Sequence, residues 1–461
     1  MTTYILRRLL LMLPTLFGIT LVVFTVMAAS PGGISAQSLI EGQNLDPEAK
    51  REIEAYYNRI YGLDQPAPMQ YLRWLNNISP IGFTFDENSQ LEGFSLTKGT
   101  NLGQSFRYGR SVKELLKERI PITLLLNLIS IPLIYVVAIS IGVRAATQRG
   151  KTFDIASGTV MLTLWSIPTM LTGVLLIGFF ANVQYWRWFP TGGLSDRKVT
   201  DMAFLPHWES LSGIFTLFGA IVVSCTIMIA MSRSKNINLR LYFMASIGLT
   251  LGYLMANSLP DAKQSLVLSV LISLIGGTIL PLFGIISHQG FRSVAMGGIG
   301  IAVGVGLTNH WIDTGFTRGF LLDRLWHLTL PIVCLSYGGF AALSKLTRTA
   351  VLENLLSDYA RTARAKGVKE VQVLWLHVFR NSLLPLITVA ASLLPSLLAG
   401  SVIVESIFSI EGMGKLAIEA VQTRDRELVL SITLLSGMLT LIGYLVADLI
   451  YAVADPRISY E

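Results

Sequence analysis

Residues 358–367 read Asp358-Tyr-Ala-Arg-Thr-Ala-Arg-Ala-Lys-Gly367, and the chain continues to Phe379-Arg-Asn-Ser-Leu-Leu-Pro385. This basic, amphipathic segment stands between two long apolar runs. If those runs cross a membrane, the segment is expected on the cytoplasmic surface, because short loops rich in Lys and Arg stay on that side. A second protein can bind it there. The rest of the sequence decides whether the chain spans a membrane.

The composition is that of a membrane protein. Of the 461 residues, 52% are hydrophobic and 14% are charged, whereas soluble domains carry about 25% charged residues. The mean hydropathy is +0.57, and apolar runs of about 20 residues recur, each long enough to cross a ~30 Å hydrocarbon core as a helix. We therefore predict an all-α polytopic membrane protein. The net charge of +7 lies in short loops beside these runs, which indicates membrane orientation and no nucleic-acid binding.

Ten membrane spans are predicted from the apolar runs. They are Leu9–Ala29, Ile122–Val143, Ile155–Phe180, Leu211–Met231, Leu241–Ala256, Ser265–Ser287, Ser293–Thr308, Leu328–Thr347, Leu383–Val404 and Leu428–Val453. If the spans alternate in direction, the short-loop cations fall on one side, so both termini are predicted to be cytoplasmic. The first run exceeds the apolar core of a signal peptide, so we expect a retained helix and not a cleaved signal.

The basic segment has the periodicity of a helix. Apolar side chains recur at helical spacing at Leu352, Leu355, Leu356, Tyr359 and Ala363, which predicts one amphipathic helix. Lys366 and Gly367 are typical of a helix C-terminus. A second helical piece is predicted with Val371, Leu374, Trp375 and Val378 on one face, and Pro385 is expected in the first turn of the next span. Periodicity alone leaves open a helix that lies on the membrane and meets anionic lipid.

Residues with recognisable reaction chemistry are scarce. The chain lacks the G-x-x-x-x-G-K-[ST] phosphate loop, and its five histidines and two cysteines show no metal-ligand spacing. We therefore predict no catalytic residue, metal or cofactor. Glu405 and Asp448 are acids close to the ends of predicted spans. For both, capping or snorkelling is favoured over substrate contact.

The sequence resembles the permease subunits of ABC importers, in particular the dipeptide and oligopeptide permease family. Arg361-Thr-Ala363 followed by Gly367 occupies the positions of that family's EAA motif, with Arg361 in place of the motif's Glu. Further similar strings, spread in order over most of the chain, are Leu6-Arg-Arg-Leu-Leu10, Tyr61-Gly-Leu-Asp-Gln-Pro66, Gln70-Tyr-Leu-Arg-Trp74, Leu102-Gly-Gln-Ser-Phe106, Arg119-Ile-Pro-Ile-Thr123, Ser166-Ile-Pro168, Phe189-Pro-Thr-Gly-Gly193, His327-Leu-Thr-Leu-Pro331, Val404-Glu-Ser-Ile-Phe408, Gly412-Met-Gly414 and Asp455-Pro-Arg-Ile458.

The resemblance implies a type I importer core of six helices and a domain plan. The plan is 1–30 first transmembrane helix, 31–121 external (periplasmic) loop or cap, 122–195 core helices two and three, 196–325 inserted block, and 326–461 core helices with a cytoplasmic coupling loop at 350–382. Four spans within 211–308 would be additional to the core. The segment expected to be external is rich in aromatic residues, which favours a small folded cap and disfavours a flexible linker. These residues include Tyr56, Tyr57, Tyr61, Tyr71 and Trp74.

The resemblance also implies a function in the bacterial plasma (inner) membrane. The chain would be the permease of an importer for peptides or similar solutes, with two ABC ATPase domains, a second homologous permease and a periplasmic or lipid-anchored solute-binding protein as partners. The segment that contacts the ATPase would comprise Leu356, Asp358, Tyr359, Arg361, Ala363, Arg364, Ala365, Lys366 and Gly367. Apolar docking by Leu356 and Tyr359 is expected to outweigh exposed ion pairs.

A weakly polar translocation path is expected to suit zwitterionic peptides. Its candidate lining residues are Asn127, Ser130, Ser166, Thr169, Thr172 and Ser392. Two alternatives remain at this stage: a self-sufficient, ion-coupled secondary transporter or channel, and a membrane scaffold without transport. An ion-coupled transporter usually places acids near the membrane midplane, and the predicted spans two, three, eight and nine have almost none.

Overall fold

The computed structural model describes residues 2–30, 63–85, 91–196 (except 183, 186 and 187), 203–258 (except 207 and 209), 265–286, 289–311, 319–393 and 402–454, with a few residues between 46 and 58. The described part of the chain is mostly helical, which confirms the all-α prediction, and its one sheet is a two-stranded antiparallel hairpin. It divides into two compact units, residues 1–172 with 331–461, and residues 173–330.

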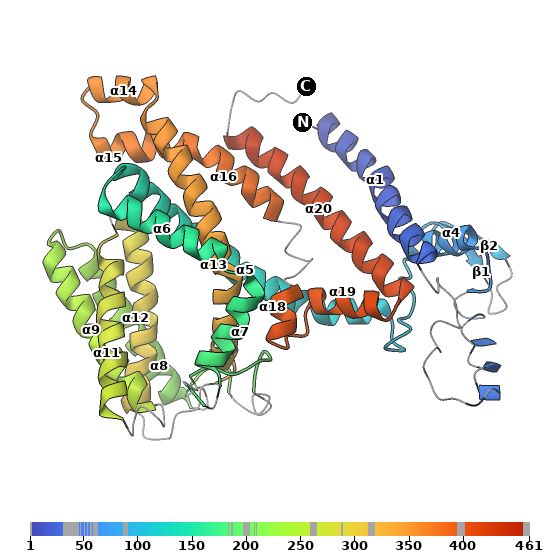
Figure 1. Ribbon diagram of the computed structural model, residues 1–461, viewed down its shortest axis with the longest axis horizontal. Coiled ribbons are helices and arrows are strands. Elements are labelled where there is room, and N and C mark those ends of the chain that lie inside the picture. Colours follow the sequence, from blue (N-terminus) through green and yellow to red (C-terminus); the bar gives the residue numbers. More distant parts are fainter. Residues whose placement is uncertain are drawn as a thin grey trace. The chain divides into compact units, whose positions relative to one another are not determined.

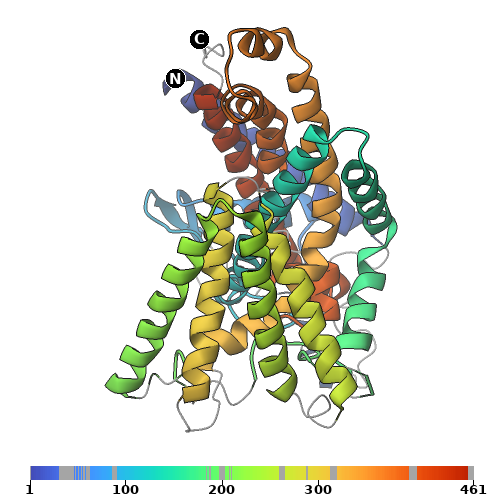
Figure 2. The same ribbon diagram turned by 90° about the vertical axis from the view of Figure 1, so that its left-hand side faces the viewer.

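In the first unit, the two terminal helices lie side by side and begin or end near the same end of the unit (Figures 1 and 2). Helix α1 (Thr2–Ala29) packs along α20 (Arg426–Ala454). Arg8 and Asp448 join them by an ion pair of 2.8 Å. In Figure 1 the start of α1, the end of α20 and the short helix α14 (Asp358–Ala365) all lie at the upper end of this unit.

The opposite end of the first unit is formed by short elements. Helices α18 (Val402–Ile407) and α19 (Met413–Gln422) lie there beside α5 (Val112–Thr147) (Figure 1). A buried apolar cluster that includes Leu115, Met413 and Leu428 joins α5, α19 and α20. Because these side chains are fully buried, the cluster holds α5, α19 and α20 together at this end of the unit.

The segment predicted to be external contains a folded element beside α1. Helix α4 (Ala67–Ile78) and the hairpin β1 (Gly82–Phe85) and β2 (Leu91–Ser95) follow each other in the chain. Tyr71 and Trp74 are buried, and the Tyr71 hydroxyl lies 2.9 Å from the Thr20 hydroxyl of α1. These two aromatic residues therefore anchor α4 to α1. Tyr56, Tyr57 and Tyr61 lie outside the described residues.

The membrane-span prediction is confirmed in broad outline. Among the described residues, nine helices are long and apolar enough to cross a membrane, and a bent pair brings the total to ten if it counts as one span. The pair corrects the predicted single helix Ile155–Phe180: α6 (Thr152–Ser166) and α7 (Thr169–Phe180) are bent by 95°. Ile167 is extended because Pro168 follows it, and the residue before a proline is disfavoured in α-helix.

The helix after the basic segment begins earlier than predicted. Short helix α15 (Glu370–Gln372) runs through a π-helical turn (Val373–Val378) into α16 (Phe379–Leu393). The prediction that Pro385 lies in the first turn is therefore wrong, because Pro385 is inside α16. The remainder of the predicted span Leu383–Val404, from residue 394 to 401, lies outside the described residues.

The second unit contains four apolar helices that pack as two pairs. Helix α8 (Leu211–Ser232) packs against α12 (Gln289–Trp311), and α9 (Ile237–Ser258) against α11 (Leu266–Gly284) (Figure 2). A Cβ atom on Gly248 would lie 2.2 Å from the carbonyl oxygen of Gly276. The backbones of α9 and α11 can approach so closely because both positions are glycine. Helix α13 (Gly319–Leu355) continues from this unit into the first.

Candidate functional site

The basic segment forms a separate short helix and not the continuous one that its periodicity predicts. Helix α13 ends at Leu355, the chain turns at Leu356 and Ser357, and α14 runs from Asp358 to Ala365. The Ser357 hydroxyl donates to the carbonyl of Asn354 at 2.6 Å, and this bond stabilises the turn. The prediction of one helix through Leu352 and Ala363 is therefore wrong, although both residues join the same buried cluster.

One face of α14 is buried and the other is exposed. Ala360 and Ala363 pack against Val143 of α5, Val351 of α13 and Val378 of the π-helical turn. Both inward residues are alanines, so the backbone of α14 lies close to its support. In contrast, Leu356 is 52% exposed and Tyr359 is 39% exposed. These two apolar side chains are therefore available to a partner.

The end of α14 matches its predicted stop signal. Gly367 has φ +78°, its N–H donates to the Arg364 carbonyl at 2.9 Å, and the Val368 N–H donates to the Ala363 carbonyl at 3.2 Å. This pair of bonds is a Schellman motif. A Cβ atom at Gly367 would meet no atom within 4 Å. The requirement for glycine is therefore conformational and not steric.

The charged residues of the segment fall into two groups. Arg364 forms an ion pair with Glu370 at 2.8 Å and also donates to the Leu355 carbonyl at 3.2 Å. Within the part of the chain that the structure describes, Arg361 makes one long contact of 3.5 Å with Asp358, and both side chains are exposed. Ala365 and Lys366 are exposed as well. Arg364 therefore holds the segment together, whereas Arg361 and Lys366 project from it.

The π-helical turn explains which of the next apolar residues are buried. Val373 and Val378 are fully buried, five residues apart, which is the hydrogen-bond spacing of a π-helix. Leu374 and Trp375 are partly buried in the same cluster. Val371 is 68% exposed, so its predicted place on the buried face is wrong. The spacing of a regular α-helix predicts that Val371 lies on the same face as Val378. The π-helical turn contains one more residue per turn and therefore shifts the buried face.

Two polar residues that the sequence analysis missed brace this site. Asn354 Nδ2 donates to the Ala350 carbonyl at 2.8 Å and to the Ser382 hydroxyl at 3.1 Å, while the Tyr359 hydroxyl donates to Asn354 Oδ1. Ser382 of α16 is fully buried, and its hydroxyl shares its hydrogen between the carbonyls of Val378 in the π-helical turn, at 2.8 Å, and Ala350 in α13, at 3.1 Å. These bonds join α13, α14 and α16. The available signal was two polar residues in the segment between two predicted spans, Leu328–Thr347 and Leu383–Val404.

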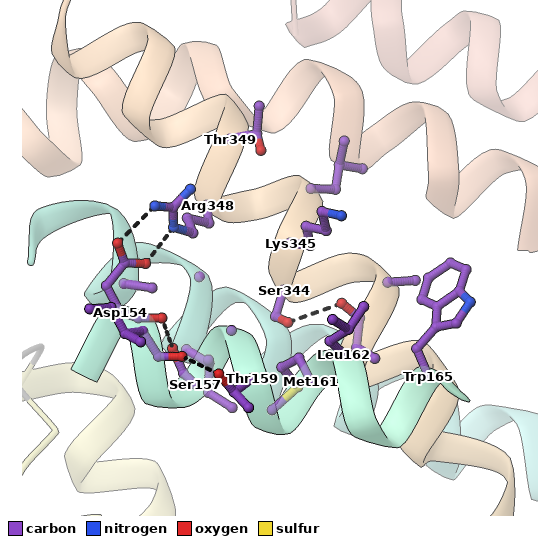
Figure 3. Close-up of a pocket in the computed structure, with 18 residues that line it drawn as sticks. Asp154, Ser157, Thr159, Met161, Leu162, Trp165, Ser344, Lys345, Arg348 and Thr349 are labelled. Atoms are coloured by element: carbon purple, nitrogen blue, oxygen red, sulfur yellow. Dashed lines mark hydrogen bonds and ion pairs between the residues drawn. The ribbon is translucent and has the colours of Figure 1, made fainter. Parts of the chain in front are cut away.

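A groove lies beside the part of α13 that precedes the basic segment, along residues 341–349 (Figure 3). It has a volume of about 920 Å³ and is lined by α5, α6 and α13. At one end Arg348 Nε donates to Asp154 Oδ1 at 2.5 Å and Arg348 Nη2 to Asp154 Oδ2 at 2.7 Å. Asp154 also accepts from the Gly150 N–H at 2.9 Å. This ion pair fixes α6 to α13 about two turns before α13 ends.

The six residues predicted for a translocation path are only partly brought together. Asn127 and Ser130 are buried within α5, and the Ser130 hydroxyl donates to the Asn127 carbonyl. The Tyr337 hydroxyl of α13 lies 3.4 Å from Thr169 Oγ1. Ser166 and Thr172 donate to carbonyls of their own helix segment. The side chain of Ser392 lies outside the described residues, so the path remains a prediction.

Glu405 has the capping role that the sequence favours. Its carboxylate accepts from the Lys415 N–H at 2.9 Å and from the Thr123 hydroxyl at 3.0 Å. Lys415 is in the first turn of α19, so the carboxylate caps that helix. A Cβ atom on Gly412 would lie 2.5 Å from the Glu405 carboxyl carbon. The Gly412-Met-Gly414 string is therefore explained by close approach to a buried acid.

Taken together, these features define a class of protein: a polytopic helical membrane protein with a braced, outward-facing helix between two of its spans. The chain belongs to the binding-protein-dependent transport system inner membrane component family. That family matches residues 225–460, and the corresponding N-terminal family matches residues 1–127. The first match begins inside the predicted inserted block 196–325, so the boundaries of that block remain a prediction.

Relatives over the full chain carry related names. The chain is 28% identical over 460 residues to the oligopeptide transport system permease protein AppB of Bacillus subtilis, with all of both chains covered. It is 26% identical over 461 residues to the dipeptide transport system permease protein DppB of Escherichia coli, again with all of both chains covered. It is 26% identical over 498 residues to the inner membrane ABC transporter permease protein YejB of Escherichia coli O157:H7, with both chains fully covered.

Proposed function

We propose that this chain is the permease subunit of an ABC importer for peptides and that its coupling loop, residues 350–382, docks onto a separate ATP-hydrolysing subunit. The observation that carries the proposal is the split character of α14. Ala360 and Ala363 attach it to α5 and α13, while Leu356 and Tyr359 face outward. A partner that grips the outward face can move α13 and α16 together, because Asn354 and Ser382 join them.

Charge supports a cytoplasmic location for this end of the first unit. The start of α1, the end of α20 and α14 share one end (Figure 1), where Arg7, Arg8, Arg361 and Lys366 lie. Membrane proteins retain such cations in the cytoplasm. Both termini are then cytoplasmic, and α4 with the β1–β2 hairpin is external.

The peptide substrate is proposed from the names of relatives. AppB and DppB are named for oligopeptide and dipeptide transport. A second permease, two ATPase domains and a solute-binding protein complete the proposed complex. ATP hydrolysis belongs to the ATPase subunits in this proposal, and the chain itself has no catalytic role.

The test is reconstitution of the complex in proteoliposomes with and without each partner. Peptide uptake is expected only when the ATPase, the second permease and the loaded binding protein are all present together with ATP. Peptide flux driven by an ion gradient in liposomes that hold this chain alone would support the secondary-transporter alternative. For orientation, an Arg361→Cys variant is expected to react with a membrane-impermeant maleimide from the cytoplasmic side only.

A further inference from the structure

Two arginines are buried at one end of the four-helix unit. Arg240 is 8% exposed and Arg292 is 7% exposed. At this end α8 and α11 finish, and α9 and α12 begin. Arg292 Nε donates to the Ser232 carbonyl at 2.6 Å, and Arg240 Nη1 donates to the Ser234 carbonyl at 2.9 Å. The Cα atoms of these serines are at most ~7.6 Å apart, so the two guanidinium groups converge.

No acid balances these charges within the four helices. Residues 210–258 and 265–311 contain no Asp or Glu, and the connecting segments at this end, 233–236 and 285–288, add Arg233 and Lys235. Among the described residues, neither Arg240 nor Arg292 forms an ion pair with a carboxylate. A buried cation without a counter-ion is strongly disfavoured.

The hydrogen bonds inside the unit use only part of the donor capacity. A guanidinium group has five N–H donors. Arg292 donates to the carbonyls of Ser232 and Ile286, and Arg240 to that of Ser234. Nε of Arg240 is buried and has no hydrogen-bond partner among the described residues. These carbonyls lie at or just beyond the C-terminal ends of α8 and α11 and offset some of the positive charge, but donors remain for an external anion.

The surroundings place that anion at the membrane surface. One turn inward from Arg240 and Arg292, the side chains of Met228, Met244 and Met296 form a buried apolar cluster. This cluster closes the interior of the unit, so an anion reaches the arginines only from the helix ends. Beside them, Leu239 is 49% exposed and Val294 is 76% exposed. A ligand with an anionic head and an apolar tail fits both features.

We propose that Arg240 and Arg292 bind the phosphate headgroup of an anionic phospholipid. Guanidinium groups bind phosphate oxygens through paired, charge-assisted hydrogen bonds, and basic pockets between membrane helices select anionic lipids. The four-helix unit thereby becomes an anchor whose stability depends on the lipid composition. This role is independent of the proposed transport function.

The test uses the full chain in nanodiscs of phosphatidylcholine with or without phosphatidylglycerol. Wild-type protein is expected to melt several degrees higher with phosphatidylglycerol and to retain this lipid through purification, as read by native mass spectrometry. In an Arg240→Gln/Arg292→Gln variant, affinity for phosphatidylglycerol is expected to fall roughly tenfold or more. An Arg233→Gln/Lys235→Gln variant, with equal charge loss at exposed positions, is the matched control and is expected to keep most of the effect.

Each other outcome overturns a stated part of the proposal. In one such outcome, inorganic phosphate stabilises the protein in pure phosphatidylcholine as strongly as phosphatidylglycerol does. The ligand of the two arginines would then be a soluble anion and not a lipid. Equal retention of phosphatidylglycerol and phosphatidylcholine by the wild type would reject the site. If the glutamine double variant fails to fold, two readouts still test the proposal. One is the selectivity of the wild type for phosphatidylglycerol over phosphatidylcholine. The other is an Arg240→Lys/Arg292→Lys variant, which is expected to bind phosphatidylglycerol more weakly because lysine keeps the charge but lacks the paired donors.

Discussion

Arg364 of α14 and Glu370 of α15 form an ion pair with a closest nitrogen–oxygen distance of 2.8 Å. The same guanidinium donates to the carbonyl of Leu355, the last residue of α13. One side chain therefore joins the three pieces of the proposed coupling loop. Since Arg364 is engaged within the loop, exposed cations such as Arg361 and Lys366 are the ones available to the proposed ATPase partner.

The first prediction separates these two roles. Arg361→Glu is expected to weaken binding of the ATPase subunit and to reduce its dependence on salt, because an outward charge is reversed. The effect of the single exposed charge is expected to be about 1 kcal/mol or less. Binding of the detergent-solubilised chain to the ATPase at two salt concentrations measures it. Arg364→Gln is the comparison and is expected to leave the salt dependence intact, since Arg364 pairs with Glu370 inside the chain.

The second prediction concerns Gly367. Gly367→Ala places a side chain at φ +78° in open space, so the strain of about 1–2 kcal/mol is local to the loop. We expect ATP hydrolysis by the assembled complex to continue while peptide uptake falls, because the cap of α14 loosens. The ratio of peptide transported to ATP hydrolysed measures this uncoupling.

Gly109 offers a matched control for that experiment. It has φ +61° and open space around its Cβ position, but it lies before α5, outside the coupling loop. Gly109→Ala carries comparable backbone strain without touching the proposed ATPase contact. An equal loss of coupling in both variants would contradict a specific role for the Gly367 cap.

The fold could be predicted from the sequence where a single local signal decides it. Apolar length identified the membrane helices, and Lys366-Gly367 identified the end of α14. The signals failed where two neighbouring rules compete. Ile155–Phe180 is long enough for one span, yet Pro168 breaks it, and local apolarity cannot say which rule prevails.

The site was less predictable because its key contacts are long-range. Asn354 and Ser382 are 28 residues apart, and Asp154 and Arg348 are 194 apart. Neither pair has a periodic signature, so local sequence patterns cannot reveal that these side chains meet. The burial of Arg292 is hidden from local patterns for the same reason, because its partner Ser232 lies 60 residues away.

The third prediction concerns the Asp154–Arg348 ion pair, which links α6 to α13. Asp154 is buried while the Arg348 side chain is one-third exposed, so we expect Asp154→Asn to cost about 1–3 kcal/mol, less than a fully buried pair. A double-mutant cycle with Arg348→Gln, read by thermal unfolding in nanodiscs, measures the coupling. Additive effects of the two single variants would show that the pair adds no stability. Lys345→Gln, which removes an exposed cation one turn earlier in α13, is the control.

The fourth prediction concerns Glu405, whose carboxylate caps α19 and accepts from Thr123. Glu405→Leu leaves buried donors without an acceptor and is expected to destabilise the protein by at least ~2 kcal/mol. Burial raises the pKa of Glu405 above its ordinary value, against the opposing effect of its hydrogen-bond donors. The folded state then binds the proton more tightly than the unfolded state, so the contribution of Glu405 is complete below that ordinary pKa and declines as pH rises through the raised one.

Glu405→Gln removes this titration while keeping one acceptor oxygen and nearly the same shape. The difference in Tm between wild type and Glu405→Gln is therefore expected to shift against the wild type as pH rises from about 4.5 toward neutrality. Thermal unfolding of both proteins in the same nanodiscs across that range measures it. Glu411→Gln is the control, because Glu411 is half exposed and its pKa is lowered. Its contribution is complete above its ordinary pKa and is lost only as pH falls below it, so its difference in Tm is expected to change little across that range. A wild-type advantage that grows with pH would mean that the donors around Glu405 outweigh its burial.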